Sequence, residues 1–167
     1  HDTFTLNYLS YKLALKNQEL ELALDLIKKA LDLDPDNGYF LDTLGWVQYK
    51  RNDFNSAVYF LEKSVSILPR SAEVIDHLGD CYLMLNRKKE AFFEWNKALK
   101  YETDKNKKQK IKKKLNKYGF CILKNINSYK VPKQLLGIIH KKSKKLKDIR
   151  LSGPHTLFSK DYKRLDI

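Results

Sequence analysis

The sequence contains few of the residues that interrupt or cross-link a chain. Its 167 residues include two cysteines, four prolines and six glycines. Cys81 and Cys121 lie far apart, so they predict neither a disulfide framework nor a closely spaced set of metal ligands, and they leave the compartment open. An apolar run of about 18 residues, which a transmembrane helix requires, is also absent. We therefore predict no disulfide scaffold and no transmembrane helix.

Acidic residues become rare after Asp104. Residues 1–103 contain 13 Lys and Arg and 16 Asp and Glu, for a net charge of −3. Residues 104–167 contain 20 and 4, for a net charge of +16, and the two parts sum to the +13 of the whole chain. Lysines on solvated faces would account for part of this asymmetry. They do not explain the loss of acids, so an anionic partner for the basic part is one interpretation.

Two segments repeat one pattern at a spacing of 34 residues. Gly45 recurs as Gly79 and Ala57 as Ala91, with a bulky residue four positions after each alanine. A fixed period of this length predicts stacked helix-turn-helix units. Glycine inside a helix costs about 1 kcal/mol relative to alanine, so we expect a second helix to cross closely at each glycine.

A third, weaker copy precedes these two. Ala23 lies 34 residues before Ala57, and Ser10 stands where the later copies have glycine. One extra residue is expected in the turn at residues 17–19. Apolar residues recur at steps of three and four, and no alternating run predicts a strand. The sequence predicts an all-α fold of three helix pairs, at about 3–16 with 19–34, 38–50 with 54–67, and 72–85 with 88–101.

This pattern resembles the tetratricopeptide repeat (TPR) family over about residues 3–118. The matched Leu-Gly steps and alanines look like the last repeats of a group of bacterial TPR proteins. The resemblance implies a right-handed α-solenoid. The sequence leaves the compartment open, and a soluble protein of the bacterial cytoplasm or periplasm is the expectation. It also implies a protein-binding scaffold of unknown partner rather than an enzyme. The expected repeats are about 3–37, 38–71 and 72–103, followed by a cap at 104–118.

The leading helices of the pairs are expected to form a concave face that binds a partner segment. Acidic and aromatic side chains are interleaved at its outward positions, which favours a peptide with apolar and basic side chains. Trp46 and Tyr49 could instead pack against a neighbouring repeat, and Asp42 and Asp76 could stabilise helix starts. The predicted groove residues are Tyr11, Asp42, Trp46, Tyr49, Lys50, Asp76, His77 and Asp80.

Two known site types do not match these residues. Carboxylate-clamp members of the family place lysine and asparagine in the groove, where this chain has Asp42, Asp76 and Asp80. Metal-ligating residue types cluster at 76–81, but no second cluster completes a ligand set. The sequence also has no glycine-rich phosphate loop and no HExxH motif. We predict no catalysis, no metal, no cofactor and no small-molecule substrate.

The basic C-terminal part is predicted to contain two helices. The first, over residues 105–118, would be N-capped by Thr103-Asp104, ended by Gly119, and would cap the array. The second, at about 132–147 within a basic extension over 119–167, could dock by its apolar side, bind an anionic membrane or nucleic acid, or be disordered. The extension could also fold back onto the acidic array.

The start of the sequence carries one further expectation. The chain begins at His1 without an initiator methionine or a leader sequence. We therefore expect a fragment or a processed product, in which further repeats could precede residue 1.

Overall fold

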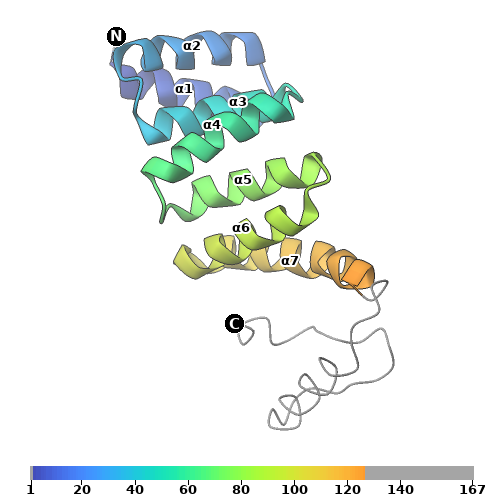
Figure 1. Cartoon of the computed structure of the whole chain (residues 1–167). Coiled ribbons are helices and arrows are strands. Elements are labelled where there is room, and N and C mark those ends of the chain that lie inside the picture. The colour runs from blue at the N-terminus through green and yellow to red at the C-terminus, as the bar shows by residue number, and fades with distance from the viewer. Residues whose placement is uncertain (1, 127–167) are drawn as a thin grey trace. The chain divides into compact units, whose positions relative to one another are not determined.

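The computed structural model describes residues 2–126, with side-chain positions up to residue 118. These residues form seven helices and no strand (Figure 1). The predicted all-α fold is confirmed. The chain divides into two compact units, His1–Leu115 and Asn116–Ile167. The helices are α1 Thr3–Lys16, α2 Leu20–Leu33, α3 Gly38–Lys50, α4 Phe54–Ile67, α5 Ala72–Met84, α6 Lys88–Tyr101 and α7 Lys105–Ile126.

Consecutive helices pack as pairs, and the pairs stack in chain order (Figure 1). The leading helix α1 pairs with α2, α3 with α4, and α5 with α6. Each trailing helix also packs against the next leading helix, and the leading helices α1, α3 and α5 contact one another in succession. The first six helices therefore form a helical repeat solenoid in which neighbouring pairs share one continuous core.

Small residues bring the paired helices close together. A Cβ atom added at Gly45 would lie 2.6 Å from Leu61 Cγ, and one added at Gly79 would lie 2.6 Å from Trp95 Cδ1. A second helix therefore does cross closely at each glycine. In the first pair the buried hydroxyl of Ser10 occupies this place and donates to the Ala23 carbonyl oxygen at 2.7 Å.

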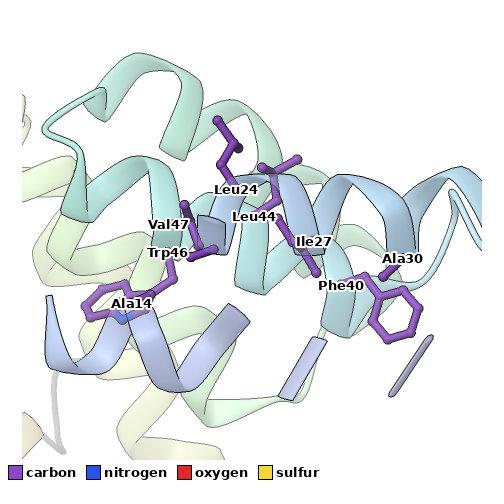
Figure 2. Packing of buried hydrophobic residues seen from close by; sticks show 9 residues of the cluster. Ala14, Leu24, Ile27, Ala30, Phe40, Leu44, Trp46 and Val47 are labelled. Atoms are coloured by element: carbon purple, nitrogen blue, oxygen red, sulfur yellow. The ribbon is translucent and has the colours of Figure 1, made fainter. Parts of the chain in front are cut away.

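The core of the first two pairs is built from aliphatic and aromatic side chains of α1, α2 and α3. Ile27, Phe40 and Val47 are fully buried in it, and Figure 2 shows them beside Leu24 and Leu44. Burying side chains of this size contributes about 1.5–3 kcal/mol each. This shared core fixes α3, which carries several of the predicted groove residues.

An asparagine in the left-handed conformation follows each leading helix. The φ angles of Asn17, Asn52 and Asn86 are 55°, 64° and 59°. Asparagine tolerates this conformation, which ends a helix and satisfies its last carbonyls. The alanine of the trailing helix lies six positions after Asn17, but five positions after the corresponding asparagine in the later pairs. The extra residue is Glu19, whose own φ of 43° shows how the turn accommodates it.

Helix α7 begins as expected but ends later. The backbone N–H of Lys107 donates to Asp104 Oδ1 at 2.8 Å, which confirms the predicted cap. The prediction that Gly119 ends this helix is wrong, because α7 continues to Ile126. A glycine in a helix costs only about 1 kcal/mol, which does not by itself stop the helix. The predicted helix at 132–147 lies outside the described residues.

Candidate functional site

Three predicted groove residues form a buried cluster between α3 and α5. The Trp46 ring stacks on His77 with centroids 4.1 Å apart and on Tyr49 with centroids 4.7 Å apart. Asp42 and His77 are each 7% exposed, and Trp46 is 8% exposed. Lys50 Nζ lies 5.2 Å from the centroid of the Trp46 ring. These aromatic side chains therefore join successive pairs and do not stand open in a groove.

An ion pair completes the cluster. His77 Nδ1 lies 2.9 Å from Asp42 Oδ1, and both side chains are almost fully buried. Burial alone lowers the pKa of His77, but the carboxylates of Asp42, Glu73 and Asp76 raise it by more. The pKa of His77 therefore lies above its ordinary value, which favours the charged imidazolium beside Asp42.

Glu73 joins three helices at the edge of this cluster. The Tyr11 hydroxyl of α1 donates to Glu73 Oε1 at 2.7 Å, and Lys107 Nζ of α7 lies 3.1 Å from Glu73 Oε2. Burial raises the pKa of Glu73, but these two donors and the charge of His77 lower it by more, so the net direction is downward. Burial and the bond to Glu73 raise the pKa of Tyr11. The contact from Tyr11 to Glu73 joins the first pair to the third, and the Tyr11 ring lies beside His77 with centroids 6.3 Å apart.

Lys114 of α7 forms ion pairs with the two remaining acids of the predicted groove. Its Nζ lies 2.8 Å from Asp76 Oδ2 and 2.7 Å from Asp80 Oδ1. Asp80 also accepts a hydrogen bond from Trp95 Nε1 at 3.1 Å. Burial raises the pKa of Asp80, the Asp76 carboxylate adds to the rise, and Lys114 opposes it without reversing it. Burial lowers the pKa of Lys114, but the two carboxylates raise it by more.

A small cavity lies beside these residues, between α5 and α7. Its volume of about 150 Å³ suits one side chain of a partner rather than a separate ligand. Lys110 of α7 lines the cavity and makes no ion pair with the described residues. Four other ionisable residues of the lining do form ion pairs: Glu73, Asp76, His77 and Lys107. The lining residues are Ala72, Glu73, Asp76, His77, Glu102, Lys107, Lys110 and Ile111.

The structure thus brings the eight predicted groove residues into one connected region but closes part of it. His77 joins most of them, because it lies beside Tyr11, Asp42 and Trp46. Tyr49 and Lys50 lie against the Trp46 ring. Asp76 and Asp80 are joined through Lys114. The α7 residues that complete the site, Lys107, Lys110 and Lys114, were not among the predicted ones.

A signal for these α7 lysines was present in the sequence. Lys107 follows Glu73 by 34 residues, and Lys114 follows Asp80 by 34 residues. Helix α7 therefore continues the repeat of the leading helices. The same spacing that identified the helix pairs places opposite charges side by side on α5 and α7.

Three further observations concern the residues that the structure describes. Within residues 2–118, no three His, Cys, Asp or Glu side chains gather in a way that could hold a metal ion. Cys81 is fully buried in α5, and burial raises the pKa of its thiol. None of the helices that the structure describes is long and apolar enough to cross a membrane.

Known proteins resemble this chain in sequence and in fold. A TPR repeat-containing protein of Methanocaldococcus jannaschii is 31% identical over 105 residues, which is 63% of this chain and 18% of that protein. A TPR repeat-containing protein of Pseudomonas aeruginosa is 34% identical over 79 residues, which is 47% of this chain and 13% of that protein. The chain thus spans less than a fifth of either relative. No family model matches the sequence.

Solved structures give the same fold. The first TPR domain of Spaghetti (RPAP3), bound to the HSP90 peptide SRMEEVD, matches with a TM-score of 0.56 at 19% identity. The match covers 68% of this chain and 93% of that one. The resemblance to the TPR family is confirmed. The chain is an all-α helical repeat solenoid with the TPR fold.

Proposed function

We propose that this chain is a non-enzymatic scaffold that binds a segment of a partner protein along the leading helices. The observation that carries the proposal is the cavity between α5 and α7, which adjoins the predicted groove residues Asp76 and His77. A peptide bound to the similar TPR domain of Spaghetti supports this use of the fold.

The charges around the cavity favour an acidic partner side chain. Glu73 and Asp76 already bind Lys107 and Lys114 within the chain. Lys110 is exposed and makes no ion pair with the described residues. Glu102, the other lining charge without an ion pair there, is buried and accepts hydrogen bonds from the backbone N–H groups of Thr103 and Asp104. Lys110 is therefore the lining charge that is open to a partner. This differs from the basic segment that the acidic groove favours in the sequence alone. Pairing inside a partly enclosed site contributes more to specificity and association rate than to affinity.

The remaining groove residues would then support the site rather than contact the partner directly. Trp46, His77 and Asp42 hold α3 against α5 through stacking and an ion pair. Truncating Trp46 would perturb this packing as well as any binding. Lys110 offers a cleaner test, because its side chain makes no such contact.

The test begins with peptides selected on the full chain from a random displayed library. The Kd of a selected peptide is measured by titration calorimetry for the wild type, Lys110→Glu and a control, Lys29→Glu. Lys29 is an exposed lysine of α2, so the control makes the same charge change away from the cavity. We expect Lys110→Glu to weaken binding at least tenfold, about 1.4 kcal/mol, and the control to change it less than twofold.

A charge swap tests whether residue 110 and the acidic residue of the peptide contact each other directly. Replacing the acidic residue of the peptide by lysine should restore binding to Lys110→Glu and weaken binding to the wild type. Equal affinity of all three proteins for the original peptide would refute the proposed site.

A further inference from the structure

The outward side of α7 carries lysines that make no ion pair with the part of the chain that the structure describes. Residues 105–114 include seven lysines and no Asp or Glu. Lys107 and Lys114 are paired with acids of α5, and Lys110 lines the cavity. The other four make no ion pair with any described residue, and all are exposed except Lys108, which is partly exposed. We call this set the outer lysines: Lys105, Lys108, Lys112 and Lys113.

The outer lysines replace the residues that join a leading helix to its trailing helix. Lys112 lies 34 residues after Leu78, and Lys113 lies 34 residues after Gly79. In α5, Leu78 is buried and Gly79 touches Trp95 of α6. A lysine at the glycine position leaves no room for a helix to cross there as α6 crosses α5. This side of α7 is therefore not built to pack against another helix of the array.

The position of α7 is fixed independently of these lysines. Ile111 is 2% exposed, and Lys107 and Lys114 attach the same side of the helix to α5. Lys105, Lys108 and Lys112 are three and four residues apart, so they follow one another along one side of the helix. At 1.5 Å per residue they span about 10 Å, and Lys113 flanks them. The array thus presents a rigid row of positive charges.

A nucleic acid fits this row better than a bilayer does. An interfacial helix binds a membrane by inserting an apolar face. The apolar residue Ile111 is buried in the array, and the other uncharged residues between the outer lysines, Asn106 and Gln109, are polar. Lysines without arginine or aromatic neighbours contact phosphates and do not read bases. We propose that the outer lysines bind the phosphate backbone of a nucleic acid without sequence preference.

The strength of such a contact depends steeply on salt. Each neutralised phosphate contributes a slope of about −0.9 to the logarithm of the affinity against the logarithm of salt concentration. Four contacts give a slope of about −3.6, which is a loss of about a hundredfold between 50 and 200 mM salt.

The experiment compares two variants of the full chain that carry equal charge. One replaces the outer lysines by glutamine, and the control replaces Lys16, Lys28, Lys29 and Lys89, which are exposed on α1, α2 and α6. Each removes four charges, so the net charge falls from +13 to 13 − 4 = +9. A third variant replaces the outer lysines by arginine. Binding of a labelled 20-base-pair duplex is followed by fluorescence anisotropy from 50 to 200 mM salt, and folding by circular dichroism.

We expect the outer-lysine variant to lose about thirtyfold or more in affinity at 100 mM salt and its salt slope to become shallower by about 3. The control should lose less than threefold, and the arginine variant should bind as the wild type does. Equal losses in the glutamine variant and its control, or no loss in either, would overturn the proposal. Binding to vesicles that contain phosphatidylserine without binding to the duplex would also overturn it. So would displacement of the duplex by poly-glutamate at equal charge concentration.

Discussion

Because α3 and α4 approach closely at Gly45, we predict that replacing this glycine by alanine lowers the free energy of unfolding. Replacing Gly45 by alanine removes the cost of glycine in a helix, which by itself stabilises the protein by about 1 kcal/mol. The new Cβ would lie 2.6 Å from Leu61 Cγ and 3.2 Å from the Ala57 carbonyl oxygen. Carbon atoms in contact ordinarily lie about 3.5–4.0 Å apart, so the new methyl group intrudes by about 1 Å.

Leu61 cannot relieve this overlap by turning outward, because its side chain is fully buried. Overpacking a core costs about 1–3 kcal/mol, and an overlap with both a buried side chain and the backbone belongs at the upper end. Subtracting the gain in helix propensity leaves a net loss of about 1–2 kcal/mol for Gly45→Ala. The measurement is urea unfolding followed by circular dichroism at 222 nm, with the slope of the transition compared between proteins.

A double-mutant cycle isolates the cause. Leu61→Ala alone should cost about 2–5 kcal/mol, because it leaves a cavity. In that background Gly45→Ala should stabilise by up to about 1 kcal/mol, since the helix propensity improves and only the 3.2 Å approach to the Ala57 carbonyl oxygen remains. The effect of the same substitution thus changes sign with the residue at 61. A stabilising Gly45→Ala in the wild-type background would show that the helices do not approach closely at this glycine.

Three further predictions concern charges and one turn. Lys114→Met leaves Asp80 partly buried without its partner and should cost about 1–3 kcal/mol in urea unfolding, because both groups keep some contact with water. Asp80→Asn should recover part of that loss, and the absence of any rescue would contradict the ion pair. The raised pKa of His77 implies a stabilisation that is complete below about pH 6.5 and is lost as the pH rises through the folded-state value. Urea midpoints should therefore fall from pH 6 towards higher pH, and parallel profiles for the wild type and Asp42→Asn would contradict this. Glu19→Gly should raise stability by about 0.5–1 kcal/mol, because Glu19 has a φ of 43°, while Glu19→Ala should not.

The fold could be predicted from the sequence because each signal was local or repeated. Gly45 and Ala57 are 12 residues apart, and their copies at Gly79 and Ala91 repeat the same contact. A close crossing of two helices requires small residues at fixed spacing, so the pattern identifies the contact directly. Where the repeat deviates, as at Glu19, the deviation falls in a turn.

The candidate site could be predicted only in part, because exposure depends on contacts between distant residues. The periodicity placed Asp42, Trp46 and His77 on the leading helices, where they are found. It could not show that Tyr11 reaches Glu73, 62 residues later, or that the Trp46 and His77 rings stack across successive pairs. Contacts of this kind between residues far apart in the chain decide which of the predicted groove residues are exposed.

One position of the repeat determines whether a leading helix can pack closely against a trailing helix. Gly45 and Gly79 occupy it in α3 and α5, and each lets a trailing helix cross. Lys113 occupies it in α7, where a side chain of that size prevents a close crossing. The side of α7 that faces α5 keeps the repeat's contacts through Lys107 and Lys114, while its opposite side has lost them. The 34-residue repeat therefore extends into α7, which stacks on α5 as a further leading helix. At the position of the glycine, however, α7 has a lysine, so the side that packs against a trailing helix in α3 and α5 is charged in α7.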